Sequence, residues 1–133
     1  MKILVLWSFE TSFIVASLNQ LSKFGHNVTL VTLDSNIQYP KQSQLVKLFS
    51  CLSIEANNFD EEVAHKDWDI IFVMGWHIPK YRKILRKKRK SFRIMYMDNQ
   101  YSGSLKQWIF RFIGPIFVRI HYDVAFVAVS YTH

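Results

Sequence analysis

The feature that most constrains the fold is an almost wholly apolar run at the start of the chain, residues 2–7 (KILVLW), with polar residues directly after it. A run that is apolar on both faces is typical of a strand in a parallel sheet covered by helices on both sides. Open α/β sheets bind their ligands where the parallel strands end. Trp7, Ser8 and Glu10 are therefore the first candidate site residues.

Strand-like and helix-like segments alternate along the rest of the 133-residue chain. The expected strands cover residues 2–7, 27–33, 52–54, 69–74, 92–97 and 123–129. The expected helices cover residues 11–24, 42–49, 61–65, a segment that starts at Pro79, and 104–122, the last one kinked or split at Gly114-Pro115. Thr11 or Ser12 suits the N-cap of the first helix, and Gly25 suits the position just after its end.

Two of the strands begin alike, because Trp68-Asp69 precedes one and Tyr122-Asp123 precedes another. Alternation of strands and helices predicts βαβ units with right-handed crossovers. We expect residues 1–133 to form a single α/β domain, with a doubly wound, Rossmann-like parallel sheet of about six strands and helices on both faces.

The composition favours a folded protein with an anionic partner. Hydrophobic residues make up 50% of the chain and charged residues 20%, and the formal net charge is +7. Such an excess of positive charge favours lipid headgroups, nucleic acid or phosphorylated ligands. A single cysteine, Cys51, agrees with a reducing compartment. We find no signal peptide and no apolar run long enough for a transmembrane helix, so the expected location is cytoplasmic.

The common catalytic and cofactor motifs are absent from the sequence. It has no glycine-rich dinucleotide motif, no P-loop and no nucleophile elbow. Its five histidines lack metal-ligand spacing, so we predict no metal site. Asp67-Trp68-Asp69 has the form of a metal-binding D-x-D, but its position favours a signal for the start of a strand. No basic and aromatic pattern of an RNA-binding module occurs, so nucleic acid is not an expected partner.

Aromatic and polar residues follow three of the expected strands. They are Trp7, Ser8 and Glu10 after the first, Trp76 and His77 after residues 69–74, and Asp98, Asn99 and Gln100 after residues 92–97. The carboxyl ends of parallel strands meet at one edge of a sheet. Aromatic faces beside hydrogen-bonding side chains suit the binding of sugars. The alternative is that the polar residues shape turns and the tryptophans pack in the core.

A basic stretch and an apolar helix indicate a second surface. No acidic residue occurs from residue 78 to residue 97, so the cations there have no partners nearby in the sequence. The cations we expect at an anionic membrane are Lys83, Arg86, Lys87, Lys88 and Arg89. The helix expected at 104–122 carries apolar residues interspersed with Lys106, Arg111 and Arg119. Its apolar face either covers the sheet or lies on a membrane.

Four segments resemble the N-terminal lobe of GT-B glycosyltransferases of the retaining family-4 type. They are MKILVLWSFETSF at the start, WDIIFVMGWH from Trp68, RIMYMDNQYSGSLKQW from Arg93, and YDVAFVAVS from Tyr122. The resemblance departs from the family in three ways. Trp7-Ser8-Phe9-Glu10 replaces a glycine-rich turn, Asp98-Asn99-Gln100 stands where a histidine is common, and the donor-binding C-terminal lobe is absent from the 133 residues.

The resemblance implies an acceptor-binding lobe that acts with a missing C-terminal lobe or partner subunit. Its substrates are then a nucleotide-sugar donor and a cell-envelope, polysaccharide or lipid-linked acceptor, with no covalently bound cofactor and no metal. Asp98 is the catalytic candidate, which orients or polarises an acceptor hydroxyl. The acceptor-binding candidates are Trp7, Ser8, Glu10, Trp76, His77, Asn99 and Gln100. Many family members are peripheral membrane enzymes, so the inner face of the cell membrane is the implied location.

The rival interpretation is a non-catalytic, Rossmann-like module. In that case the basic stretch and the apolar helix dock to a membrane or to a partner chain, and the edge of the sheet binds no substrate. The sequence names neither the donor nor the acceptor.

Overall fold

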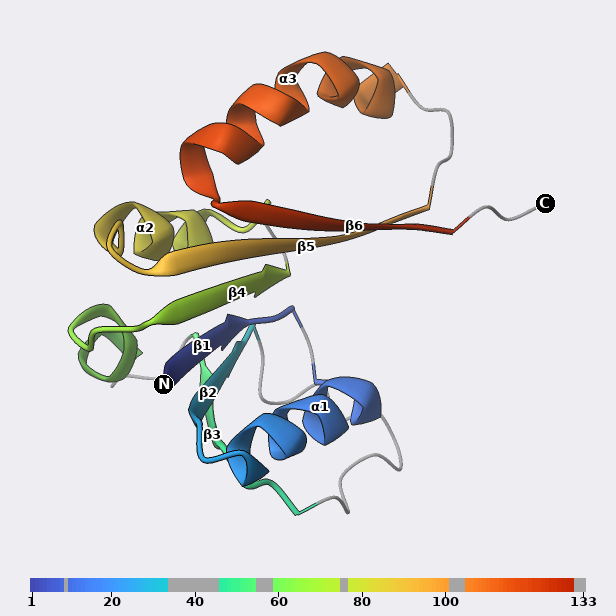
Figure 1. The fold of residues 1–133 in the computed structure, drawn as a ribbon. Coiled ribbons are helices and arrows are strands. Elements are labelled where there is room, and N and C mark those ends of the chain that lie inside the picture. The colour runs from blue at the N-terminus through green and yellow to red at the C-terminus, as the bar shows by residue number, and fades with distance from the viewer. Residues whose placement is uncertain (9, 34–45, 55–58, 75–76, 101–104, 131–133) are drawn as a thin grey trace.

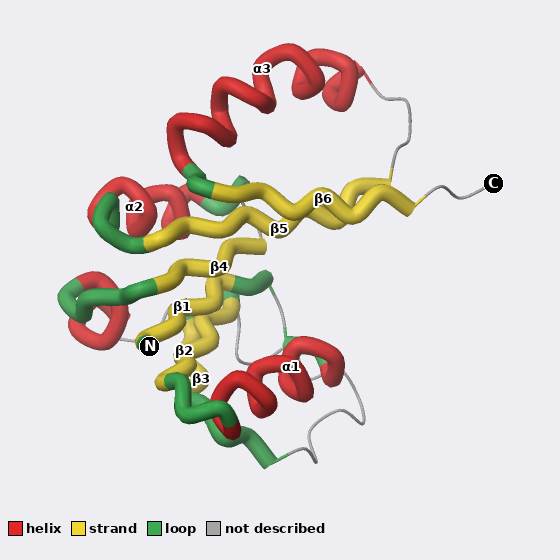
Figure 2. The backbone as a smooth tube through the Cα atoms, viewed as in Figure 1, coloured by secondary structure: helices red, strands yellow, loops and turns green. Residues whose placement is uncertain are grey.

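A computed structural model describes residues 1–8, 10–33, 46–54, 59–74, 77–100 and 105–130 and shows one six-stranded parallel sheet (Figure 1). The strands are β1 (Lys2–Leu6), β2 (Asn27–Thr32), β3 (Ser50–Ser53), β4 (Ile70–Met74), β5 (Phe92–Gln100) and β6 (Val124–Ser130). The helices are α1 (Ser12–Lys23), the short π-helical η1 (Asp60–Ala64), α2 (Pro79–Lys87) and α3 (Leu105–His121). Figure 2 shows how strands and helices alternate along the backbone.

The strand order is β3-β2-β1-β4-β5-β6, and every pairing is parallel. The chain therefore builds outward from β1 to β3 and then returns to add β4 on the other side of β1. This reversal makes the crevice between β1 and β4 the topological switch point of the sheet. The order confirms the predicted doubly wound, Rossmann-like α/β fold.

Helices cover both faces of the sheet, which confirms the second part of the prediction. On one face, Ile14, Val15 and Leu18 of α1 pack against β1 and β2. On the other face, Tyr81, Ile84 and Leu85 of α2 share a larger core with η1 and with partly buried side chains of α3. The two cores explain why residues 3–7 are apolar throughout, since neighbouring residues of β1 point into opposite layers.

Local signals set the limits of α1 as expected. The Thr11 side chain accepts a hydrogen bond from the Ile14 amide at 3.3 Å, so Thr11 is the N-cap. Gly25 follows the helix with a φ of 82°, a conformation that glycine adopts without steric cost.

The paired signals Trp68-Asp69 and Tyr122-Asp123 have the same structural role. The Asp69 carboxylate accepts the Lys2 amide at 2.7 Å, and the Asp123 carboxylate accepts the Arg93 amide at 2.8 Å. Each aspartate thus binds the start of the neighbouring strand. The aromatic residue before each aspartate is buried. This confirms that Asp69 marks the start of a strand, and the described residues hold no cluster of histidine, cysteine or acidic side chains suited to a metal ion.

Several sequence-based boundaries are wrong. The strand expected to end at residue 97 continues to Gln100, because β6 supplies backbone partners as far as Ser130. Residues 46–49 are not helical, and the rest of the helix expected over 42–49 lies outside the described residues. The last helix, α3, runs through Pro115 without a break. One cation of residues 78–97 has an acidic partner distant in the sequence, since Arg93 pairs with Asp123 at 3.3 Å.

Candidate functional site at the carboxyl edge of the sheet

The carboxyl ends of β1, β4 and β5 lie side by side, as the sequence predicts (Figure 1). In register, Leu6 lies beside Val73, and Met74 lies beside Tyr96. Because β4 stops at Met74, β5 extends beyond it by the four residues Met97–Gln100. At this edge, β5 and β6 therefore extend further along the strand direction than β1 and β4 do.

Trp7 belongs to the core and forms no open wall of this edge. Its side chain is 6% exposed, and its ring stacks with those of Phe72 and Tyr96 at centroid distances of 6.1 and 5.6 Å. The expectation that Trp7 offers an aromatic face to a sugar is therefore wrong, because its ring is buried beside α1. Tyr96 and Phe72 are only partly buried, so they carry the more accessible part of this aromatic stack.

Tyr81 fixes the exit of β1 to the first turn of α2, a contact that the sequence did not reveal. Its hydroxyl donates to the Trp7 carbonyl at 2.8 Å and lies 3.3 Å from the Val31 carbonyl. The side chain is fully buried, and this burial raises the pKa of Tyr81 above its ordinary value. The helix expected to start at Pro79 includes Tyr81, but no local pattern identified the distant acceptors of its hydroxyl.

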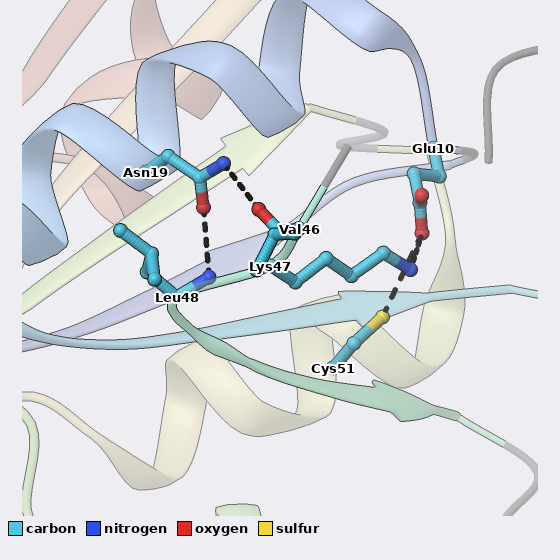
Figure 3. Close-up of polar contacts among 6 residues, drawn as sticks. All are labelled: Glu10, Asn19, Val46, Lys47, Leu48 and Cys51. Atoms are coloured by element: carbon cyan, nitrogen blue, oxygen red, sulfur yellow. Dashed lines mark hydrogen bonds and ion pairs between the residues drawn. The ribbon is translucent and has the colours of Figure 1, made fainter. Parts of the chain in front are cut away.

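Glu10 points toward the edge strand β3, where it pairs with Lys47 (Figure 3). The Lys47 ammonium lies 2.6 Å from Oε2 of Glu10, and the Cys51 thiol lies 3.9 Å from the same oxygen. In the same region, Asn19 of α1 accepts the Leu48 amide and donates to the Val46 carbonyl, both at 2.8 Å. Asn19 thus ties the segment before β3 to α1 through two hydrogen bonds, and the ion pair of Lys47 with Glu10, just before α1, adds a third contact.

The charges of this cluster shift two pKa values. The hydrogen bond with Glu10 raises the pKa of Lys47, against a smaller opposite effect of burial. Partial burial raises the pKa of the Cys51 thiol, and Lys47 opposes this shift while Glu10 adds to it. The thiol is accessible to solvent but stays protonated at neutral pH, so it is a poor nucleophile there.

The remaining edge candidates are described only in part. Ser8 is half-buried at the exit of β1, and His77 is exposed just before α2. Trp76 lies outside the described residues. Asp98, Asn99 and Gln100 are placed by their backbone in β5, beside Ala128, Val129 and Ser130, but their side chains lie outside what the structure describes. The fold thus brings the three strand exits together, while Trp7 and Glu10 face other partners.

The predicted basic surface is divided between two sides of α2. Lys80, Lys83 and Lys87 line a pocket of about 190 Å³ beside η1, with Asp60 at its rim. Arg86 and Arg89 instead line an open groove between α2 and α3. Lys88 donates to the Lys66 carbonyl at 2.6 Å. No helix of the described residues is long and apolar enough to cross a membrane.

Comparison with known proteins establishes the fold alone. No family model matches the chain, and no curated protein matches it. The chain is similar to the solved structure "Structure of MT0777", with 14% sequence identity and a TM-score of 0.58. The match covers 99% of this chain and 88% of that one. At this identity the similarity supports the Rossmann-like α/β arrangement and carries no information about activity.

Proposed function

We propose that this chain is the acceptor-binding half of a glycosyltransferase that takes a sugar from a nucleotide-sugar donor. The acceptor is a cell-envelope, polysaccharide or lipid-linked sugar, and a second, donor-binding lobe or subunit completes the enzyme. The half described here is inactive alone and needs no metal and no covalently bound cofactor. We place the enzyme on the cytoplasmic side of the cell membrane.

The observation that carries this proposal is the switch point between β1 and β4. Ligands of open α/β sheets bind at the carboxyl ends of the strands beside such a reversal. The residues that follow β1 and β4 include hydroxyl and imidazole groups, and β5 adds a carboxylate and two amides in sequence. This chemistry suits the hydroxyl groups of a sugar, and the resemblance to the family-4 lobe supports the same assignment.

In the proposed site, Asp98 orients or polarises the acceptor hydroxyl. Asn99 and Gln100 bind sugar or phosphate groups, while Ser8 and His77 bind from the exits of β1 and β4. Trp76 is the remaining candidate for an aromatic wall, and Tyr96 joins it because its ring is partly exposed. Glu10 is bound to Lys47, so we assign it to the support of the edge.

The first test measures binding of acceptor sugars to the 133-residue chain by amide NMR. Titration with oligosaccharide acceptors is expected to shift the amides of Ser8, His77 and Asp98–Gln100. The amides of Lys2 and Arg93, at the opposite edge, serve as internal controls. Shifts confined to the opposite edge, or none at millimolar sugar, would contradict the proposed site.

The second test measures sugar transfer by the two-lobe enzyme. Asp98→Ala is expected to lower kcat by at least tenfold, while circular dichroism of the variant stays that of the parent. Asp60→Ala, which removes a carboxylate beside α2, is the matched control and should leave kcat unchanged. Equal turnover of Asp98→Ala and the parent would remove Asp98 from the catalytic role.

The second candidate function is a non-catalytic docking module, and the exposed apolar face of α3 favours it. The two candidates differ in one measurement. A docking module binds its partner but shows no acceptor-dependent shifts at the β1, β4 and β5 edge.

A further inference from the structure

Helix α3 presents a mostly apolar face to solvent. Seven large apolar side chains of this helix are between 45% and 72% exposed. They are Leu105, Trp108, Ile109, Phe112, Ile113, Ile116 and Ile120. At about 3.6 residues per turn they share one stripe that covers roughly 140° of the helix circumference. The opposite side, with Gly114, Phe117 and Val118, faces the core.

The stripe is larger than the scattered apolar groups of an ordinary surface. A fully accessible large apolar side chain presents on the order of 150 Å², so seven that are between 45% and 72% exposed present on the order of 600 Å² together. That value is at the upper end for the largest apolar patch of a typical monomer. Trp108 and Phe112 form an edge-to-face pair at 5.0 Å within it. A patch of this size on one helix indicates a docking surface.

Cations border one end of the apolar stripe. Ile120, the last residue of the stripe, lines the same groove as Arg86, Arg89, Arg93 and His121. Arg93 is held by Asp123, but Arg86 and Arg89 are exposed. Arg119 is exposed within the stripe itself. Guanidinium groups bind phosphate in a bidentate geometry, and here they lie next to apolar side chains.

This combination of features selects an anionic lipid surface over a second copy of the chain. A membrane offers apolar acyl chains and phosphate groups in adjacent layers, and a helix with aromatic and basic faces lies in that boundary. In a two-fold dimer through α3, the same groove of each copy would add its arginines to the interface, and like charges would repel. With 17 residues, α3 lies along the surface and does not span it.

We propose that α3 docks this protein onto an anionic membrane, with its apolar stripe in the headgroup layer and a lipid phosphate held by Arg86 and Arg89. This inference goes beyond glycosyl transfer and stands without it. If the transfer proposal is also correct, membrane docking brings the carboxyl edge of the sheet to lipid-linked acceptors.

The test is co-sedimentation of the 133-residue chain with vesicles of phosphatidylcholine alone or with phosphatidylglycerol. Binding is expected with the anionic vesicles and is expected to be at least tenfold weaker with the neutral ones. Phe112→Gln should weaken binding by about tenfold, because it removes one aromatic anchor. The matched control is Phe13→Gln, since Phe13 is 73% exposed on α1, at the other face of the sheet. It should leave binding unchanged.

A second pair of variants tests the arginine groove. Replacement of Arg86 and Arg89 by glutamine is expected to weaken binding to anionic vesicles by roughly tenfold at low salt. Replacement of Lys80 and Lys83 removes the same charge from the other side of α2, and it should weaken binding by only about twofold. Circular dichroism confirms that each exposed substitution leaves the fold intact.

Three outcomes would overturn the proposal. Equal losses from the two charge variants would show attraction by net charge and no role for the groove. Equal losses from the two phenylalanine variants would remove α3 from the contact. A concentration-dependent dimer in sedimentation velocity that is abolished by Phe112→Gln, with no vesicle binding, would assign the stripe to a second copy of the chain.

Discussion

Two buried tyrosines provide a matched test of how the hydrogen bonds of this fold contribute to stability. The Tyr81 hydroxyl donates to the Trp7 carbonyl at 2.8 Å. The Tyr122 hydroxyl is also buried but has no hydrogen-bond partner among the residues that the structure describes. Tyr81→Phe and Tyr122→Phe remove the same atom from two interiors of similar burial, so the difference between the variants isolates the hydrogen bond.

The expected difference in the free energy of unfolding is about 2 kcal/mol. Tyr81→Phe leaves the Trp7 carbonyl without this donor, which costs about 1–2 kcal/mol. The Val31 carbonyl loses little, because it also accepts the Trp7 amide at 2.9 Å. Tyr122→Phe removes a desolvated hydroxyl, so its effect should lie between zero and a gain of about 1 kcal/mol. For a domain of this size, 1 kcal/mol corresponds to about 3–5 °C in Tm.

The assay is urea denaturation of the parent and the two variants at pH 7, followed by circular dichroism. Unchanged m-values would confirm that the variants unfold from equally compact states. Burial raises the pKa of Tyr122 to about 12 and also raises the pKa of Tyr81. Neither hydroxyl therefore ionises between pH 5 and 9. The difference should therefore be constant over that range. A Tyr122→Phe variant that is destabilised as much as Tyr81→Phe would refute the reasoning.

Two further predictions concern the charged pairs. Burial acts to raise the pKa of Asp123, but hydrogen bonds from Arg93 outweigh it and lower that pKa. The stability that this pair contributes is therefore present above the unfolded pKa and is lost as the pH falls through the folded one. Because the pair is partly exposed and screened, Asp123→Asn should cost less than about 1 kcal/mol at pH 7. Urea midpoints measured down to pH 3 should then converge for parent and variant, and a gap that persists would contradict this account. For the Cys51 thiol, Glu10→Gln should lower the pKa and speed alkylation by iodoacetamide at pH 8 by a factor of a few, while the control Glu62→Gln should not. An unchanged rate would show that the carboxylate does not act on the thiol.

Much of the candidate site could be anticipated from the positions of strand ends. The sequence placed Ser8, His77 and Asp98 just after three expected strands. Parallel topology brings the ends of those strands to one edge, although Asp98 lies within β5. The partners of individual side chains could not be anticipated. Glu10 and Lys47 are 37 residues apart, and no pattern along the chain links them.

The sequence by itself determined the order of the elements and the layered architecture. Residues that are apolar on both faces dictate a covered parallel strand, a threonine cap and a glycine limit α1, and an aromatic-aspartate pair marks the start of two strands. These signals are local, so each can be identified within a few residues. Their agreement along the chain predicts a doubly wound sheet.

Only the tertiary structure decided which side of each element is covered. The sequence of α3 is amphipathic and does not show which side of the helix packs on the sheet. Packing through Phe117 and Val118 leaves the seven-residue stripe in solvent. The same assembly placed Trp7 in the core and extended β5 to Gln100 by pairing with β6. It also placed Lys80, Lys83 and Lys87 of α2 on a different side of the helix from Arg86. Burial and pairing are properties of neighbours distant in the chain, and hydrophobic periodicity does not identify those neighbours.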